Sequence, residues 1–200
     1  CHNFYPRKDT GLDKDWIIQK NKKLKTFGLK VMMFIPGDEK KRGPVFEGLP
    51  TVESHRSQSV FTSFVECLED LFADEVLIGD IKASRKELAK IKDYIDNGVI
   101  TLEVEHLSDL EYIDRCLSNR KDVAMNVVRC VESRTVLKKQ DIVPYNTVQR
   151  EIGAITMDNE RYGRYQGEVQ IVKRPLEADE RVNVIGEVCE ASKGLLQYIK

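Results

Sequence analysis

The residues best suited to chemistry gather in one segment, RGPVFEGLPTVESHR, which runs from Arg42 to Arg56. It lies between an apolar run that predicts a buried strand, Val31 to Ile35, and an amphipathic run that predicts a helix, Val60 to Phe72. Such connections usually take about two to six residues, whereas this one takes more than twenty by position. A long loop that is stiffened by proline and rich in ionisable side chains is typical of a binding loop. The alternative is an ordered surface loop whose charges are merely solvated.

Polar side chains also follow the two other predicted strands of the first part. One group follows a short strand candidate, Cys1 to Tyr5, and Asp80 comes directly after a buried run and a glycine. Ligand sites of α/β folds form at the C-terminal ends of parallel strands, so we expect these groups to lie near the Arg42–Arg56 loop. The alternative for Asp80 is a helix or turn cap. For His2 the alternative is a core histidine whose hydrogen bonds are satisfied.

This combination of side chains suits the chemistry of sugars or sugar phosphates. Glycoside hydrolysis needs a protonated acid and a second carboxylate, and the candidates are Glu47, Glu53 and Asp80. For Glu53 the alternative is the first turn of a helix, where the macrodipole favours a carboxylate. Arginine binds phosphate and carboxylate through paired, charge-assisted hydrogen bonds. The candidate substrate-binding residues, which combine arginines with smaller polar groups, are His2, Asn3, Arg7, Arg42, His55, Arg56, Asn159 and Arg164.

The last two of these lie in a second polar segment, Asn146 to Val188. There Asn159 stands next to a predicted strand, and Arg164 precedes Tyr165. Either this segment forms a ligand-facing edge, or its polar residues are turn formers and a solvated charged face.

Composition excludes several classes of function. The chain has 200 residues, a net charge of -1 and 41% apolar residues, which predicts neither a nucleic-acid nor a membrane-surface partner. No apolar run approaches the ~20 residues of a membrane span. The five cysteines are scattered and odd in number, which argues against a disulfide framework and indicates a reducing cytoplasm. Phosphate-loop, dinucleotide and nucleophile-elbow motifs are missing, and we expect neither a cofactor nor a metal.

Two patterns divide the chain. Up to Asp80, strands alternate with helices, which predicts parallel strands with helical crossovers. Beyond it, Ser84 and Glu87 predict the start of a helix that ends before Gly98, and Ser108 predicts another short helix. Most of the remainder reads as strands, at residues 123–131, 153–158, 167–173 and 181–188, before a closing helix at 191–199. We therefore predict two parts, residues 1–82 and 83–200.

The first part holds too few strands to stand as a closed structure. Three strands cannot form a barrel, so they belong either to a small open sheet or to the end of a (β/α)8 barrel. Because Cys1 already lies in a strand-like run, we expect a further part of the protein upstream.

Four motifs resemble one family in the same order. They are HNFYPR at His2–Arg7, RGPVFEGLPTVESHR at Arg42–Arg56, LIGD at Leu77–Asp80 and the block from Asn146 to Gly186. Together they are similar to the bacterial 6-phospho-N-acetylmuramidases, some of which carry an older label, outer surface protein of unknown function. The resemblance covers almost the whole chain. It departs at Gly153-Ala154, where the family pattern has an acidic residue after the glycine.

The resemblance implies a fold of class α/β plus mainly β. Residues 1–82 would be the last strands of a (β/α)8 TIM barrel, and residues 83–200 a cyclophilin-like β-barrel domain. The implied reaction is hydrolysis of the glycosidic bond in a 6-phosphorylated N-acetylmuramic acid disaccharide, in the cytoplasm, during recovery of cell-wall sugars. The alternatives are a non-catalytic carbohydrate-binding protein, an inactive fragment, or a peptide-binding or isomerase role for the second part. A cyclophilin-like fold does not by itself confer that last role.

Overall fold

The computed structural model describes residues 1–105, 117–133 and 141–200. The chain forms two compact units, Cys1–Ile100 and Thr101–Lys200. This division falls after the sequence-predicted boundary near Asp80 to Ser84. The short helix predicted at Ser108 lies outside the described residues. Within the described ranges, no helix is long and apolar enough to cross a membrane.

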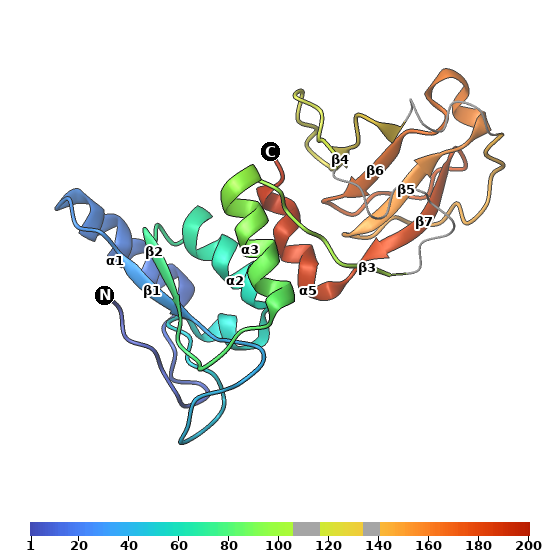
Figure 1. Ribbon diagram of the computed structural model, residues 1–200. Coiled ribbons are helices and arrows are strands. Elements are labelled where there is room, and N and C mark those ends of the chain that lie inside the picture. The colour runs from blue at the N-terminus through green and yellow to red at the C-terminus, as the bar shows by residue number, and fades with distance from the viewer. Residues whose placement is uncertain (106–116, 134–140) are drawn as a thin grey trace. The chain divides into compact units, whose positions relative to one another are not determined.

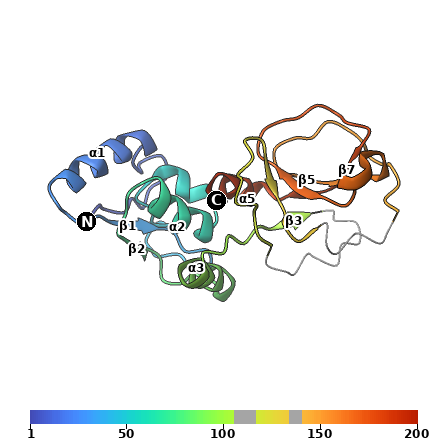
Figure 2. The ribbon, with the colours of Figure 1, turned by 90° about the horizontal axis from the view of Figure 1, so that it is seen from above.

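The first unit surrounds two parallel strands with helices (Figures 1 and 2). Strands β1 (Met32–Ile35) and β2 (Glu75–Ile78) pair in parallel, with Met32 opposite Glu75 and Ile35 opposite Ile78. The other elements, in chain order, are α1 (Lys14–Thr26), η1 (Glu53–Ser57), α2 (Val60–Glu69) and α3 (Arg85–Asn97).

The helices begin and end at residues that satisfy their free backbone groups. Asp13, Ser59 and Ser84 cap α1, α2 and α3 by accepting a hydrogen bond from a backbone N–H of the first turn. Helix α3 ends at Gly98, which has the left-handed φ of 69° that favours glycine. The predicted start and stop of this helix are therefore confirmed.

Glu87 does more than support the cap of α3. Its backbone N–H donates to Ser84 Oγ at 3.3 Å, but its carboxylate accepts from the backbone N–H of Phe61, in α2, at 2.8 Å. Lys90 completes this buried group by donating to Glu87 Oε1 at 2.5 Å. The carboxylate therefore joins α3 to α2, and α3 belongs with the first unit.

The core of the first unit lies where the helices meet the strand pair. Met33 and Ile35 of β1 are fully buried with Ile17 of α1 and with Phe61 and Val65 of α2, all at most 1% exposed. The buried positions of β1 were predicted from its continuous apolar run, and those of α2 from its helical spacing.

The second unit is built on a five-stranded antiparallel sheet with the order β3-β7-β5-β6-β4. Its strands are β3 (Val104–Glu105), β4 (Val127–Arg129), β5 (Ala154–Asp158), β6 (Val169–Val172) and β7 (Val182–Val188). Each of the last four lies within a longer run that the sequence predicts as a strand. The helical elements are η2 (Glu160–Tyr165), α5 (Glu190–Lys193) and η3 (Gly194–Tyr198). The predicted change from parallel to antiparallel pairing is thus found.

Alternation along β5 separates an apolar face of this sheet from a polar one. Ile155 and Met157 belong to the apolar core, together with Val169 of β6 and Ile185 of β7. Because side chains of a strand alternate between faces, Asp158 lies on the opposite face.

The predicted fold class, part of a TIM barrel followed by a cyclophilin-like β-barrel, is wrong for this chain. Among the described residues, the parallel sheet has only β1 and β2, and the antiparallel sheet ends at β3 and β4, which do not pair with each other. A barrel requires its first and last strands to hydrogen-bond. The segment Cys1 to Tyr5 forms no strand, because its backbone makes only separate hydrogen bonds, such as His2 N–H to Met32 O.

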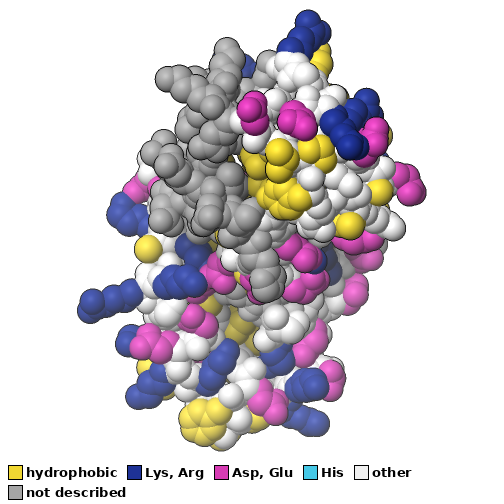
Figure 3. All heavy atoms as spheres, turned by 90° about the vertical axis from the view of Figure 1, so that its right-hand side faces the viewer, with side chains coloured by type: hydrophobic (Ala, Val, Ile, Leu, Met, Phe, Trp, Pro, Cys, Tyr) yellow, Lys and Arg dark blue, Asp and Glu magenta, His cyan; other side chains and the backbone are white. Residues whose placement is uncertain are grey.

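Charged side chains of both signs are interspersed on the face shown in Figure 3. This distribution agrees with the nearly balanced composition, 32 basic and 33 acidic residues.

Candidate functional site

The connection between β1 and α2, residues 36–59, carries most of the candidate site residues. It has little regular structure beyond η1, so side chains must satisfy the backbone groups that a helix or sheet would otherwise pair. Three charged residues do this, Arg56, Glu53 and Asp80.

Arg56 ties three segments of the first unit together. Its Nε and Nη2 donate to the two oxygens of Glu53 at 2.7 and 3.0 Å. Its Nη1 donates to the carbonyls of Glu47 and Gly48, and its Nη2 also donates to the carbonyl of Tyr5, all within 3.1 Å. A further bond, from Nη2 to the Arg7 carbonyl at 3.0 Å, is the sixth. A guanidinium has only five N–H donors, so Nη2 shares one of its two among these acceptors. No donor of Arg56 is left for a ligand in this arrangement.

Glu53 is held on both of its carboxylate oxygens. Besides Arg56, the backbone N–H groups of Asp9 and Gly11 donate to it at 2.9 and 2.6 Å. A Cβ on Gly11 would lie 2.5 Å from Glu53 Oε2, so glycine is required for this close approach. The hydrogen bond from Arg56 is the main cause that lowers the pKa of Glu53 to about 2, and the side chain is therefore ionised at neutral pH.

Asp80 holds the other end of the loop. It follows β2, as predicted, but its side chain is fully buried, with 0% exposure. Its oxygens accept from the backbone N–H groups of Gly37 at 2.9 Å, Arg42 at 2.8 Å and Leu49 at 3.3 Å. Lys41 Nζ lies 3.8 Å from the same carboxylate. These contacts fix the two ends of the 37–49 segment and leave the carboxylate without access to solvent.

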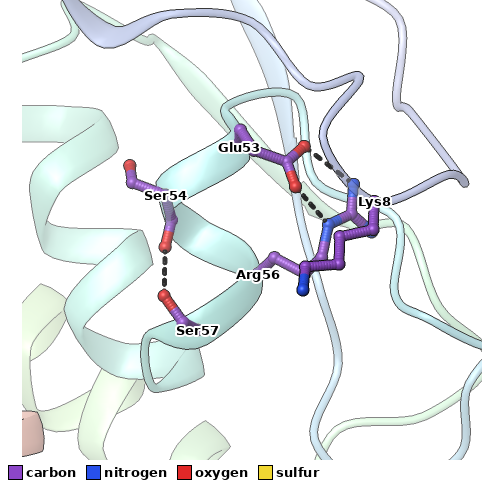
Figure 4. A pocket seen from close by; sticks show the side chains of 5 residues that line it. All are labelled: Lys8, Glu53, Ser54, Arg56 and Ser57. Atoms are coloured by element: carbon purple, nitrogen blue, oxygen red, sulfur yellow. Dashed lines mark hydrogen bonds and ion pairs between the residues drawn. The ribbon is translucent and has the colours of Figure 1, made fainter.

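A shallow pocket opens beside η1, and Figure 4 shows it from close by. Its lining residues are Lys8, Glu53, Ser54, Arg56 and Ser57. The Glu53 carboxylate faces the Arg56 guanidinium there, and Ser57 Oγ donates to the Ser54 carbonyl at 3.2 Å.

Glu47 is the candidate carboxylate that remains exposed. One oxygen accepts from the backbone N–H of Lys8 at 3.0 Å, and the carbonyl of Glu47 accepts from Arg56. Glu47 therefore contacts two residues, Lys8 and Arg56, that line the pocket.

Three cations lie on the segments that Arg56, Glu47 and Asp80 hold through backbone groups. The side chains of Arg7, Lys8 and Arg42 are exposed, and within the described ranges none makes a hydrogen bond or ion pair. Lys8 was missed in the sequence, although it follows Arg7 directly in the segment that Glu47, Glu53 and Arg56 fix in place. Exposed cations of this kind are suited to binding an anionic ligand.

The two candidate histidines, His2 and His55, are not among the residues that line this pocket. His2 shares a 2.7 Å hydrogen bond with Asn21, which is buried in α1, and the neighbouring Asn3 contributes its carbonyl to Thr51. His55 is completely buried, and its ring nitrogens have no hydrogen-bond partner among residues 1–105, 117–133 and 141–200. Its nearest acidic group is Glu66, whose Oε2 lies 3.6 Å from His55 Nε2.

Glu66 is a second acidic residue of this unit whose pKa lies well below its ordinary value. Burial alone would raise its pKa, but His55 and Lys14 outweigh burial and lower the pKa to about 2. Lys14 comes from α1 and His55 from η1, and both lie against the buried carboxylate of Glu66 in α2.

The two candidates of the second unit have local partners. Asn159 is completely buried, caps η2 through the backbone N–H of Arg161, and donates to Asn183 Oδ1 at 2.8 Å. Arg164 lies over the ring of Tyr165, 4.8 Å from its centroid. Both belong to the unit that does not contain the 36–59 connection.

Asp158, also in the second unit, was missed in the sequence. It is only 5% exposed. Burial, followed by the neighbouring charges of Glu168 and Asp179, raises its pKa to about 7. An acidic residue at the last position of an otherwise apolar strand was the available signal.

No group of three or more His, Cys, Asp or Glu side chains is arranged to hold a metal ion in residues 1–105, 117–133 or 141–200.

Comparison with known proteins gives a consistent result for both units. A family model described as 6-phospho-N-acetylmuramidase, N-terminal, matches residues 1–93, and one described as 6-phospho-N-acetylmuramidase, C-terminal, matches residues 99–200. A search of curated proteins finds no match.

Two solved structures are similar over the whole chain. One is a conserved protein of unknown function from Enterococcus faecalis, 39% identical, with a TM-score of 0.84, of which 55% is covered. The other is an uncharacterised protein from B. cereus, 30% identical, with a TM-score of 0.78, of which 59% is covered. All of this chain is covered in both comparisons, so the chain spans little more than half the length of these two proteins.

Proposed function

We propose that this chain, which belongs to the 6-phospho-N-acetylmuramidase family, takes part in hydrolysing the glycosidic bond of 6-phospho-N-acetylmuramic acid glycosides. The observation that carries the proposal is a set of three exposed cations, Arg7, Lys8 and Arg42, whose side chains make no hydrogen bond or ion pair within the described ranges. Their backbone groups are held by Arg56, Glu47 and Asp80 respectively. Such a substrate carries a phosphate and a lactyl carboxylate, and cations of this kind are suited to both.

The three candidate carboxylates have different roles in this proposal. Glycoside hydrolysis uses two carboxyl groups that contact the reacting atoms. Glu47 is the exposed one and supplies one of these groups. Asp80 is buried and bonded to three backbone N–H groups, and Glu53 is bonded on both oxygens. These two are positioning residues that hold the loop on which Glu47 and Arg42 lie.

The state of the thiols supports a proposal for the compartment. Cys1, Cys67, Cys130 and Cys189 are free. Free thiols support a reducing compartment, and we propose the cytoplasm.

The test is release of sugar from a 6-phosphorylated muramyl disaccharide, compared with the unphosphorylated disaccharide. We expect turnover of the phosphorylated substrate alone. Glu47→Gln should lower kcat at least a hundredfold, as loss of a general acid or base does, with little change in binding. Arg42→Ala should raise KM for the phosphorylated substrate and leave kcat unchanged.

A matched control lies on the same connection. Glu39 is an exposed glutamate paired with Lys82 at 2.7 Å, and Glu39→Gln should keep full turnover. Wild-type turnover in Glu47→Gln would contradict the role of Glu47.

Binding without catalysis is the second candidate function. The observation that favours it is the full engagement of Asp80 and Glu53, which leaves one free carboxylate among the three candidates. Calorimetric binding of the phosphorylated disaccharide without any release of sugar would support this second function over the first.

A further inference from the structure

The loop between Arg42 and Gly48 exposes a large aromatic side chain. Phe46 is 64% exposed, next to Glu47. Exposure of one apolar residue is ordinary by itself. What distinguishes Phe46 is its backbone, which has a φ of 61°.

A positive φ is unfavourable for phenylalanine. The left-handed region costs a non-glycine residue about 1 kcal/mol or more, and phenylalanine has no polar side chain that could offset this cost locally. Such a conformation persists where the surroundings hold it in place. Here Asp80 binds the N–H of Arg42 on one side, and Arg56 binds the carbonyls of Glu47 and Gly48 on the other.

The position of the Phe46 ring is fixed as well. A Cβ on Gly43 would lie 3.0 Å from Cζ of Phe46, so the tip of the ring rests against the bare backbone of Gly43. The remainder of the ring is open to solvent. Phe46 is thus an exposed aromatic surface on a loop whose backbone Asp80 and Arg56 hold.

We propose that Phe46 is a platform on which the apolar face of the sugar ring of the phosphorylated substrate lies. This inference rests on the proposed function and adds a specificity-determining residue to the same site. A pyranose presents C–H groups on its faces, which contact an aromatic ring favourably, while its phosphate and carboxylate need cations. Arg7, Lys8 and Arg42 recognise the charge, and Phe46 recognises the sugar, so the site distinguishes a sugar phosphate from inorganic phosphate.

The test is calorimetric titration of the full 200-residue chain with the 6-phosphorylated muramyl disaccharide and, separately, with inorganic phosphate. Phe46→Ala should weaken binding of the disaccharide about tenfold and leave binding of phosphate unchanged. Phe46→Gly should weaken disaccharide binding equally while making the protein at least as stable, because glycine adopts a positive φ without strain.

Phe72 provides the matched control. It is also an exposed phenylalanine with a positive φ, 57°, but it follows α2 and lies beneath Lys22. Phe72→Gly should relieve the same strain and leave disaccharide binding unchanged. Equal weakening by Phe72→Gly and Phe46→Gly would overturn the platform, because the effect would then come from the backbone.

Two other outcomes separate the two proposals. If the wild-type chain binds the disaccharide and Phe46→Ala binds it equally well, the platform is wrong and the proposed function stands. If the wild-type chain binds no phosphorylated disaccharide, the proposed function fails, and the platform fails with it.

Discussion

At the scale of single residues, a charged side chain in this protein either organises the loop or is free to bind. Arg56 uses all its donors on the protein, whereas Arg42 presents an unpaired guanidinium from the same connection. Both are arginines of the same motif, and only their contacts show that one organises the loop and that the other is available to a ligand. The more deeply engaged residue is the structural one.

Replacing Arg56 should therefore affect stability. We expect Arg56→Lys to lower the free energy of unfolding by about 2–4 kcal/mol, since a lysine cannot reproduce the paired bonds to Glu53 and leaves several carbonyls without a donor. Arg42→Lys, at an exposed and unpaired position, should change it by less than about 0.5 kcal/mol. Urea denaturation measures both. Equal stability of the two variants would refute the structural role of Arg56.

Asp158 makes a second prediction at this scale. Its pKa is about 7 in the fold, against 3.8 for the unperturbed side chain. Between these values the unfolded chain has lost the proton and the folded chain keeps it, so this group makes stability fall as pH rises from about 4 to about 7. Asp158→Asn should remove that fall and raise the Tm of the second unit at pH 8.

Thermal melts at pH 4, 6 and 8 test the role of Asp158. Glu151, an exposed residue that precedes the same strand, gives the control Glu151→Gln, which should keep the wild-type pH dependence. An unchanged pH profile in Asp158→Asn would show that the carboxyl is already ionised in the fold.

At the scale of elements, the 36–59 connection behaves as part of the fold. Its ends are fixed by Asp80, which follows β2, and its centre by Arg56, which lies in η1. A loop held in this way loses little further conformational freedom when it binds a ligand. That is the physical benefit of placing buried charges beneath it.

Asp80→Asn tests this view of the loop. An amide has one acceptor oxygen in place of two, so at least one of the three backbone N–H groups loses its partner. We expect a loss of about 1.5–3 kcal/mol in stability and faster proteolysis within residues 37–49. Asp38→Asn is the control, because Asp38 is exposed and its carboxylate accepts a backbone bond from Ser84, outside the 36–59 loop. Wild-type stability together with lost turnover would instead assign Asp80 to the chemistry.

At the scale of the whole molecule, the chain consists of two units that divide between Ile100 and Thr101. The contacts of α3 explain the position of this division. Glu87 bonds to Phe61, and the ring of Tyr94 contacts those of Phe61 and Phe64 edge-on. Helix α3 is therefore required to cover α2.

Truncation tests the boundary. Residues 1–100 should unfold cooperatively in urea, and residues 101–200 should do so separately. Residues 1–82 lack α3 and should show no cooperative transition, because Phe61 and Phe64 would lose their cover. A cooperative transition of residues 1–82 would move the boundary back to the position predicted from the sequence.

Local order in the sequence was enough to locate most of the elements of this protein. Apolar runs and caps located α2, α3 and the strands β1, β2, β5, β6 and β7, since helix ends and strand periodicity depend on neighbouring residues. The motifs also determined the family, which the two family models confirm. The sequence also identified the 36–59 connection as exceptional, because its length and its charged residues can be read without knowing the fold.

Only the tertiary structure decided how the strands pair and which charges are free. Barrel closure depends on contacts between distant strands, and here those contacts form two open sheets. The sequence treats Asp80, Glu53 and Glu47 alike, yet the fold buries the first, neutralises the second with Arg56 and leaves the third exposed. A side chain's accessibility and partners are set by residues that lie close only after folding, such as Gly37 beside Asp80 and Gly11 beside Glu53.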